Sequence, residues 1–236
     1  MQANSIKYFV IVMCNKYENG EGMIKLVIFD WDGTLFDSID GICRSMLAAG
    51  VKAKAPERNS DHIKNVIGLG LSEAINTVWP ESLHLTPKII EYYKAIYVAQ
   101  DQKAPLAYKG VESILENLKR DGYLLAVATG KSRKGLDRVM SNTGTQDLFV
   151  DSRCADETLS KPDPLMLNEL LQSLDVSVDE AIMIGDTEYD LSMAKKAKMR
   201  SIGVSYGAHE AHRLHRHNPI AVVDCFTKID EIIRGI

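Results

Sequence analysis

The sequence predicts an α/β protein with a three-layer core around a mostly parallel sheet, and a small helical module inserted near the start of that core. Three observations favour this fold class. Short apolar runs alternate with segments of helical periodicity along most of the chain, which is typical of a parallel sheet covered on both faces. Residues 56–103 instead carry helical periodicity with no convincing strand. Carboxylate, hydroxyl or ammonium groups follow several apolar runs, where open α/β sheets place their ligands.

The first predicted strand is the apolar run 24–29, which contains β-branched residues. It stops at the stretch Asp30-Trp31-Asp32-Gly33-Thr34. Gly33 allows the backbone to turn tightly and to approach a ligand, because glycine has no Cβ. Two acids at one buried strand end are costly unless a cation lies nearby. The sequence therefore predicts a reaction centre at this strand end.

The helical module follows at once. Asp37 and Ser38 are expected to cap a helix that ends at Gly50. Three short helical faces then follow, separated by Pro56, Gly68, Gly70, Pro80 and Pro87. We expect the module to span 37–103, between core segments 23–36 and 104–236, with residues 1–22 as an N-terminal extension.

The core then continues with regular alternation. Strands are predicted at 123–128, less strongly in 148–155, and at 181–184, 201–204 and 221–223, with helices at about 111–120, 132 onward, 165–174, 187–198 and up to 232. The strand at 123–128 runs into Thr129-Gly130-Lys131, and the strand at 181–184 runs into Gly185-Asp186 with Asp190 four residues later. Polar groups therefore recur at strand ends throughout the core.

Composition narrows the class of protein. The chain has 236 residues, of which 45% are hydrophobic and 25% charged, as expected for an ordinary globular protein with a substantial core. A formal net charge of -4 argues against a nucleic-acid binder that relies on positive charge. Four cysteines without a Cys-x-x-Cys pair argue against a disulfide framework or structural zinc, and favour the reduced thiols of a cytoplasmic protein.

Residues 1–22 leave two interpretations open. The apolar run 8–14 is too short for a membrane span and lacks the features of a signal peptide, so we expect no membrane association. Either Met23 is the natural start and the preceding residues are an incidental extension, or residues 6–12 add an edge strand.

Four sites together resemble the signature motifs of the haloacid dehalogenase-like superfamily: Asp30-Trp31-Asp32-Gly33-Thr34, Thr129, Lys161 and Gly185-Asp186-x-x-x-Asp190. The likeness runs in order from Met23 to the C-terminus. It implies a Rossmann-like core, and the helical module resembles the C1-type cap of that family. Within the superfamily, Ile67-Gly68-Leu69-Gly70-Leu71 and Lys161-Pro162-x-Pro164 resemble the phosphoglycolate phosphatase-like branch.

The resemblance implies a role for each site residue. Asp30 is the implied nucleophile, forming an aspartyl-phosphate, because a carboxylate can split hydrolysis into two displacements. Repulsion between carboxylate and phosphate calls for Mg²⁺, implied to be held by the side chains of Asp30 and Asp186 and the backbone carbonyl of Asp32. Asp190 is implied to assist the metal or to hold Lys161.

The other implied roles concern proton transfer and phosphate binding. Asp32 is the implied general acid–base, and its presence favours phosphate chemistry over dehalogenation, since a halide leaves without a proton. Thr129 and Lys161 are implied to bind the non-bridging phosphate oxygens. The backbone amides of Gly33 and Gly130 are further expected donors.

Each assignment has a purely structural alternative. Asp30 and Asp32 could be loop acids that only add solubility. Thr129 is also a plausible helix cap, Lys161 a surface lysine, and Asp186 with Asp190 acids that complement a helix N-terminus. At the level of function, the expected activity is Mg²⁺-dependent hydrolysis of a small soluble phosphate ester, for which the resemblance suggests 2-phosphoglycolate. A β-phosphoglucomutase-type phosphomutase and a non-catalytic module that binds phosphorylated metabolites are the alternatives.

Three weaker features remain. The histidines at 209, 212, 215 and 217 are interpreted as part of a solvated helix, because no carboxylate or thiol cluster completes a metal site. Gly68-Leu69-Gly70 is implied by the resemblance to be a cap turn facing the active site. Lys131 and Arg133 are equally consistent with binding an anionic substrate tail and with an ordinary helix start.

Overall fold

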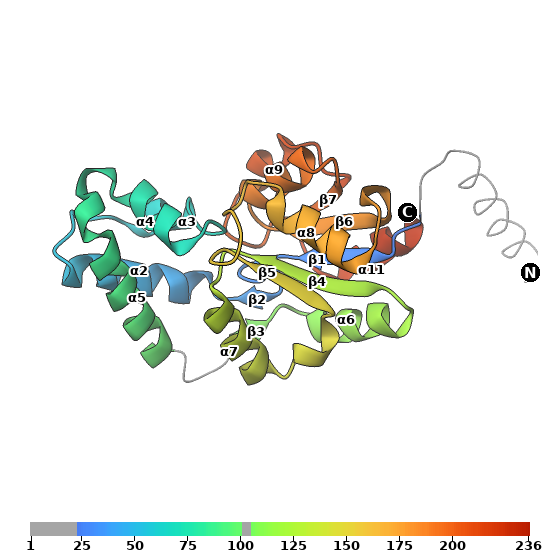
Figure 1. Ribbon diagram of the computed structural model, residues 1–236, viewed down its shortest axis with the longest axis horizontal. Helices are drawn as coiled ribbons and strands as arrows, with labels where there is room; N and C mark the ends of the chain where they lie inside the picture. Colours follow the sequence, from blue (N-terminus) through green and yellow to red (C-terminus); the bar gives the residue numbers. More distant parts are fainter. Residues whose placement is uncertain (1–22, 101–104) are drawn as a thin grey trace, which may run out of the picture.

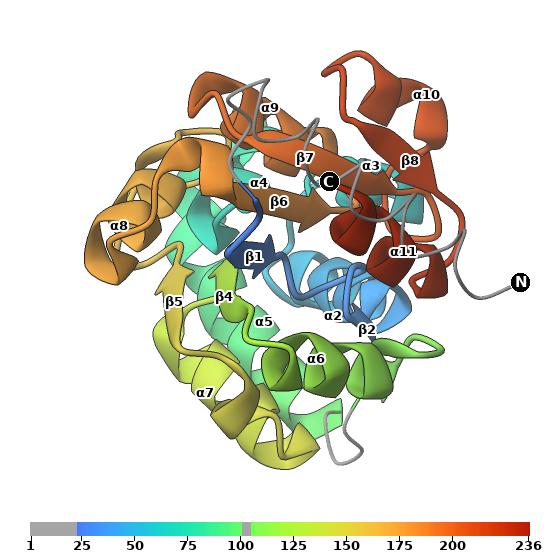
Figure 2. The same ribbon diagram turned by 90° about the vertical axis from the view of Figure 1, so that its right-hand side faces the viewer.

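A central six-stranded sheet organises the protein (Figures 1 and 2). This computed structural model describes residues 23–100 and 105–236. The strands lie in the order β5-β4-β1-β6-β7-β8, and every neighbouring pair is parallel. Their bounds are β1 (Leu26–Phe29), β4 (Leu124–Thr129), β5 (Asp151–Cys154), β6 (Ala181–Gly185), β7 (Arg200–Val204) and β8 (Ala221–Val223). The predicted α/β fold with a mostly parallel sheet is confirmed.

Helices cover both faces of this sheet (Figure 2). Successive strand side chains point to opposite faces, so Val27 and Phe29 join one apolar cluster and Leu26 and Ile28 join the other. The first cluster packs against α6 (Val111–Arg120), α7 (Arg133–Thr143) and α11 (Thr227–Gly235). The second packs against α8 (Leu165–Leu174) and α9 (Glu188–Lys196). The short helix α10 (Ala211–His215) contacts α9 and β7.

The helices inserted after β1 form a separate group, at the left of Figure 1. Their bounds are α2 (Ile39–Lys52), α3 (Ser60–Lys64), α4 (Leu71–Val78), the 3₁₀ turn η1 (Pro80–Leu85) and α5 (Thr86–Gln100). They pack on one another around a third apolar cluster that includes Ile63, Ile75 and Ile89. We call this group the helical module. It is joined to the core by the antiparallel ribbon of β2 (Phe36–Asp37) and β3 (Leu106–Ala107).

Some local predictions were wrong. Gly50 does not end its helix: α2 continues to Lys52, and the absence of a Cβ at Gly50 makes room for the Trp79 ring. Ser38 is at the N-cap position of α2, but its side chain makes no capping bond. The weak third strand is confined to β5, because residues just before it form the 3₁₀ turn η2 (Gln146–Leu148).

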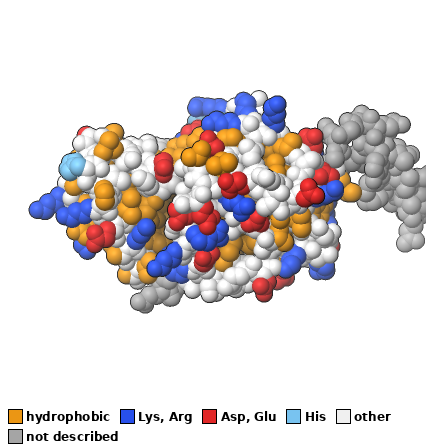
Figure 3. Space-filling model, in the orientation of Figure 1, with side chains coloured by type: hydrophobic (Ala, Val, Ile, Leu, Met, Phe, Trp, Pro, Cys, Tyr) orange, Lys and Arg blue, Asp and Glu red, His pale blue; other side chains and the backbone are white. Residues whose placement is uncertain are grey.

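The two interpretations of residues 1–22 lie outside the described residues. Among residues 23–100 and 105–236, no helix combines the length and the apolar character needed to cross a membrane. Cys43, Cys154 and Cys225 are free thiols. On the face shown in Figure 3, acidic and basic side chains are intermixed, so neither sign forms a continuous patch there.

Candidate active site

The order of the strands brings three of the predicted residues to one edge of the sheet. β1 lies between β4 and β6, in register with both. The residues that end or follow these strands, Asp30, Thr129 and Asp186, are therefore neighbours, and each is at most 1% exposed. At Gly33 the backbone adopts a φ of 78°, a left-handed conformation that glycine enters without strain. This turn begins the path of the chain from the strand end toward the helical module.

Lys161 enters the same site from the loop before α8. Its Nζ lies 2.8 Å from Asp30 Oδ1 and 2.6 Å from Asp190 Oδ1, and its side chain is fully buried. Burial alone lowers the pKa of Lys161, but the attraction of Asp190 and Asp30 outweighs it, so the net shift of the pKa is upward. Lys161 is thus a buried cation between two carboxylates, and the surface-lysine interpretation is wrong.

Asp186 completes a cluster of acids. It accepts hydrogen bonds from the Thr34 hydroxyl at 2.9 Å and from the Ala208 amide at 2.7 Å. Within the described part of the chain, the one group of three or more side chains with metal-ligand spacing is Asp30, Asp186 and Asp190, whose ligand atoms lie within 4.8 Å of one another. Asp30 Oδ2 has no hydrogen-bond partner among the described residues. A set of buried carboxylate oxygens with one of them unpartnered fits a hard cation such as Mg²⁺.

The electrostatics of this cluster also call for a cation. Burial raises the pKa of Asp30, Lys161 opposes that effect, Asp190 adds to it, and the result is a pKa of about 7. Burial and the charges of Asp30 and Asp190 likewise raise the pKa of Asp186 well above its ordinary value. Since one lysine does not compensate three buried acids, a further positive charge would stabilise their ionised forms.

Asp32 is not a member of the acidic cluster and makes a different set of contacts. Its Oδ2 lies 3.0 Å from Lys131 Nζ, and its Oδ1 accepts a 2.6 Å hydrogen bond from the Ser38 hydroxyl. Burial lowers the pKa of Lys131, but the neighbouring Asp32 and Tyr97 more than reverse this shift. The role of Ser38 was missed because its position before α2 indicated only a helix cap.

Thr129 and Gly130 lie where β4 ends. The Thr129 hydroxyl oxygen accepts a hydrogen bond from the Lys131 amide at 3.2 Å, which leaves its own proton free to be donated. A Cβ on Gly130 would lie 2.5 Å from the carbonyl oxygen of Leu69 and 2.7 Å from that of Gly68. The glycine thus allows the loop of the helical module to approach the strand end closely.

The Gly33 amide does not match its predicted role as a hydrogen-bond donor to phosphate. Its N–H donates a 2.9 Å hydrogen bond to the Phe36 carbonyl, so it is already satisfied within the turn. This bond ties Gly33 to Phe36 within the loop, and the sequence pattern could not distinguish that use of the amide from ligand binding.

Comparison with known proteins adds independent information. The family model described as "Haloacid dehalogenase-like hydrolase" matches residues 27–204. The chain belongs to this family. A phosphoglycolate phosphatase of Vibrio parahaemolyticus is 30% identical over 219 residues, which cover 89% of this chain and 96% of that protein. The "Probable phosphatase IndB" of Dickeya dadantii is 33% identical over 212 residues, covering 88% of this chain and 92% of that protein.

Solved structures agree with the family assignment. The crystal structure of a predicted phosphatase from Clostridium acetobutylicum superimposes with a TM-score of 0.82 and 27% identity, covering 91% of this chain and 100% of that chain. The prediction of a phosphoglycolate phosphatase-like hydrolase of the haloacid dehalogenase-like family is therefore confirmed.

In this hydrolase a cavity of about 530 Å³ opens between the core and the helical module. Asp30, Asp32, Thr129 and Gly130 line it from the core, and the Gly68–Gly70 loop lines it from the module. The Gly70 amide donates a 2.7 Å hydrogen bond to the Ser160 hydroxyl, which ties this loop to the core. The implied position of the loop, facing the candidate site, agrees with this geometry.

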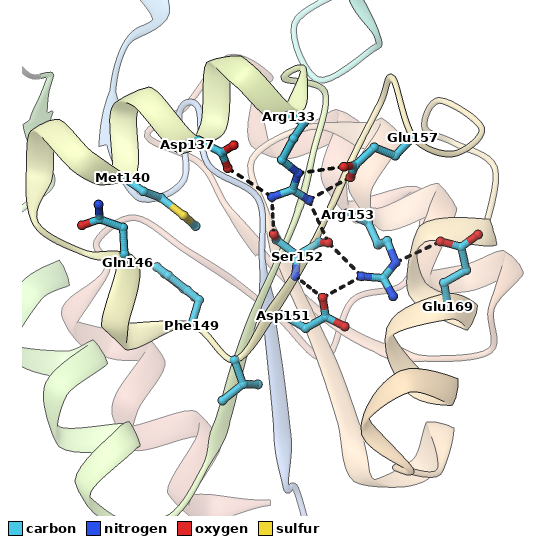
Figure 4. Close-up of a pocket in the computed structure, with 11 residues that line it drawn as sticks. Arg133, Asp137, Met140, Gln146, Phe149, Asp151, Ser152, Arg153, Glu157 and Glu169 are labelled. Carbon is cyan, nitrogen blue, oxygen red and sulfur yellow. Dashed lines mark hydrogen bonds and ion pairs between the residues drawn. The ribbon is translucent and has the colours of Figure 1, made fainter.

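Arg133 does not line this cavity. Its guanidinium contacts Glu157 and Ser152 in a second cavity beside β5 (Figure 4), where Arg153 pairs with Asp151 and Glu169. These charges are paired with one another at the edge of the sheet. Arg133 is therefore not placed to bind an anionic part of the substrate, which its sequence position had left open.

The solvated-helix interpretation is wrong for His209. This residue precedes α10, is 1% exposed, and accepts a hydrogen bond from the Glu188 amide at 3.1 Å. Burial and the nearby Arg213 lower the pKa of His209 to about 4, so the ring is neutral. By contrast, His212 and His215 are exposed.

Proposed function

We propose that the protein is a Mg²⁺-dependent phosphatase that hydrolyses a small phosphomonoester through an aspartyl-phosphate on Asp30. The observation that carries the proposal is the environment of Asp30. Its carboxylate lines the cavity, lies 2.8 Å from the buried Lys161 ammonium, and has one oxygen with no hydrogen-bond partner in the described residues. That oxygen is available as a nucleophile.

The side chains of Asp30 and Asp186 and the backbone carbonyl of Asp32 would hold the metal. When bound, Mg²⁺ supplies charge neutralisation that lets a carboxylate approach a phosphate. Asp190 is assigned to Lys161 rather than to the metal, because it lies 2.6 Å from Nζ and its other oxygen accepts hydrogen bonds from Thr187.

The chain's own residues would carry out two displacements. Asp30 forms a bond to phosphorus while the bond to the leaving oxygen breaks, and Asp32 gives its proton to that oxygen. Asp32 then accepts a proton from water, which attacks phosphorus and breaks the bond to Asp30. The Lys131 ammonium and the Ser38 hydroxyl hold the Asp32 carboxyl in place during both proton transfers.

Thr129 and Lys161 would stabilise the transferring group. The Thr129 hydroxyl keeps a free proton, and an ammonium has three N–H donors, of which Lys161 directs two to Asp30 and Asp190. The third donor and the Thr129 hydroxyl are assigned to non-bridging phosphate oxygens, with the Gly130 amide as a further donor. The helical module would exclude bulk water from the reaction.

Release of inorganic phosphate tests this proposal. We expect hydrolysis of p-nitrophenyl phosphate with Mg²⁺ and its loss in EDTA, with 2-phosphoglycolate included because several relatives carry that substrate in their names. Asp30→Asn should lower kcat by about 10⁴-fold or more, whereas Asp147→Asn, at an exposed position, should leave it unchanged. Appreciable turnover by Asp30→Asn would contradict the nucleophile assignment, and transfer of phosphate to a product without release would indicate a mutase.

A further inference from the structure

The cavity that contains the candidate site has two chemically different parts. Its floor is polar and comes from the strand ends, with Asp30, Asp32 and Thr129. Its opposite wall comes from the helical module and is apolar over α2, α3 and α5. The side chains that form this wall are Ile42, Met46, Ile63, Val66, Ile90 and Tyr93.

The wall is built from well-packed side chains. Met46 and Val66 are 3% and 4% exposed and belong to the apolar cluster of the module. Tyr93 extends this surface with an aromatic ring, which stacks on the Tyr97 ring at a centroid distance of 5.5 Å. The module also lines the cavity with Ser72, Glu73 and Lys94, but most of the side chains that it presents to the substrate are apolar or aromatic.

The volume of the cavity and the charges of its lining residues both limit which substrates fit. A volume of about 530 Å³ falls in the range of roughly 300–1,000 Å³ that accommodates drug-sized ligands. A phosphorylated two-carbon acid would occupy the polar floor and leave the apolar wall uncovered. Its carboxylate would gain nothing from that wall, because an ion against apolar atoms loses its hydration without compensation. Among the basic residues that line the cavity, Lys131 is already paired with Asp32, and Lys94, Lys134 and Arg138 lie outside the apolar wall.

We propose that the preferred substrate is a phosphomonoester whose leaving alcohol carries an apolar, ring-bearing body that packs against Met46, Val66 and Tyr93. This inference rests on the proposed function for the phosphate end of the molecule. The apolar body is bound by burial against the module, and the ring stacks on the Tyr93–Tyr97 pair.

Two matched pairs of compounds test it with the full-length protein and Mg²⁺. The first pair is 2-phenylethyl phosphate and ethyl phosphate, both esters of primary alcohols, so a difference in kcat/KM reports binding of the ring. We expect about 10–100-fold higher kcat/KM for the phenyl ester, corresponding to burial of one aromatic side chain. 2-Phosphoglycolate, measured beside them, should also be the poorer substrate.

The second pair separates binding from turnover. 3-Phenylpropylphosphonate and propylphosphonate are the non-hydrolysable counterparts of the two esters, and calorimetry should give about 10–100-fold tighter binding of the phenyl compound. If the phosphonates show this ratio but no ester is hydrolysed, the proposed hydrolysis fails, whereas the assignment of the wall as the binding surface for an apolar ring stands. If the esters are hydrolysed with equal kcat/KM, or 2-phosphoglycolate is preferred, the inference is overturned and the proposed function stands.

A substitution in the wall tests whether the preference for the phenyl ester arises there. Ile90 is half-buried in the wall, so Ile90→Trp should fill part of the cavity and lower the ratio of the two kcat/KM values by about tenfold. Leu83→Trp, on the exposed 3₁₀ turn η1 of the same module, should leave the ratio unchanged. An unchanged ratio in a folded Ile90→Trp protein, judged by its thermal unfolding, would overturn the assignment of the wall.

Discussion

Lys161 Nζ lies 2.6 Å from Asp190 Oδ1, and this contact joins the loop before α8 to the first turn of α9. Asp190 is itself held firmly, because its Oδ2 accepts hydrogen bonds from the Thr187 amide at 3.0 Å and the Thr187 hydroxyl at 2.6 Å. The capping box of α9 therefore fixes the Asp190 carboxylate, and this carboxylate in turn holds the Lys161 ammonium in place.

Asp190→Asn should remove the charge that faces Lys161 while preserving the shape of the side chain. Both groups are fully buried, so we expect the free energy of unfolding to fall by about 3 kcal/mol. Urea denaturation at neutral pH measures this. Asp230→Asn, which breaks a partly exposed i,i+4 pair with Arg234, is the matched control and should cost less than about 1 kcal/mol. Equal losses in the two variants would show that Asp190 is not a buried partner of Lys161.

Removal of the metal should make stability depend on pH. The pKa of Asp30 is about 7 in the folded protein, above the ordinary 3.8, and the pKa of Asp186 is also raised. At pH values between about 4 and 7, these two carboxyl groups keep protons in the folded chain that they have released in the unfolded chain. The contribution of these two acids to the free energy of unfolding in EDTA should therefore fall as pH rises from about 4 through about 7, by up to about 1.4 kcal/mol per pH unit for each group.

Mg²⁺ should reverse this loss, and its stabilising effect should grow over the same pH interval. Denaturation curves from pH 5 to pH 8, with EDTA or with Mg²⁺, measure both trends. Asp30→Asn should show a shallower slope in EDTA, because one of the titrating groups is gone. Equal slopes for the wild-type protein and Asp30→Asn in EDTA would contradict the buried-acid description, because His209 contributes equally to both.

Gly130→Ala should push the Gly68–Leu69 segment away from the end of β4. The added Cβ would lie 2.5 Å from the Leu69 carbonyl oxygen, so the module or the strand end must shift. A displacement of about 1 Å at an active site can cost about 10²-fold in rate, and we expect a fall in kcat/KM of that order. The kinetics of p-nitrophenyl phosphate hydrolysis provide the measurement.

Gly41→Ala is the control for that substitution. Gly41 lies inside α2 and a Cβ there meets nothing within 4 Å, so alanine should leave kcat/KM unchanged and raise stability by about 0.5–1 kcal/mol. If both alanine variants keep full activity, close approach of the loop to Gly130 is not required for catalysis.

His209 should limit stability in mild acid. Its pKa is lowered to about 4, first by burial and then by Arg213, whereas an unfolded histidine takes up its proton near 6.5. The folded chain thus binds fewer protons at His209, and the contribution of this residue to the free energy of unfolding should decrease by about 3 kcal/mol as pH falls from about 6.5 to about 4. This contribution is opposite in sign to that of the buried acids. His209→Asn should flatten that decrease, and His215→Asn, at an exposed position, should not. Parallel pH-dependent denaturation of the three proteins tests this.

Much of the fold could be predicted because its determinants are local. The run of apolar residues before Thr129 placed β4 within one residue of its observed bounds, Leu124–Thr129. The helical module was predicted from its periodicity and its glycine and proline breaks. The ribbon of β2 and β3 was missed, since two-residue strands leave no periodic pattern. The end of α2 was wrongly predicted at Gly50, because the packing of this glycine against Trp79 overrode its tendency to end a helix.

The sequence by itself determined which reactive groups follow the strands, because strand ends and turn glycines are encoded by neighbouring residues. Only the tertiary structure decided how those groups are paired: Lys131 with Asp32, Arg133 with Glu157, and buried His209 with the Glu188 amide. Such pairings depend on strand order and on the placement of the helical module, which bring together segments far apart in the chain. For the same physical reason, the apolar wall opposite Asp30 exists only in the folded molecule.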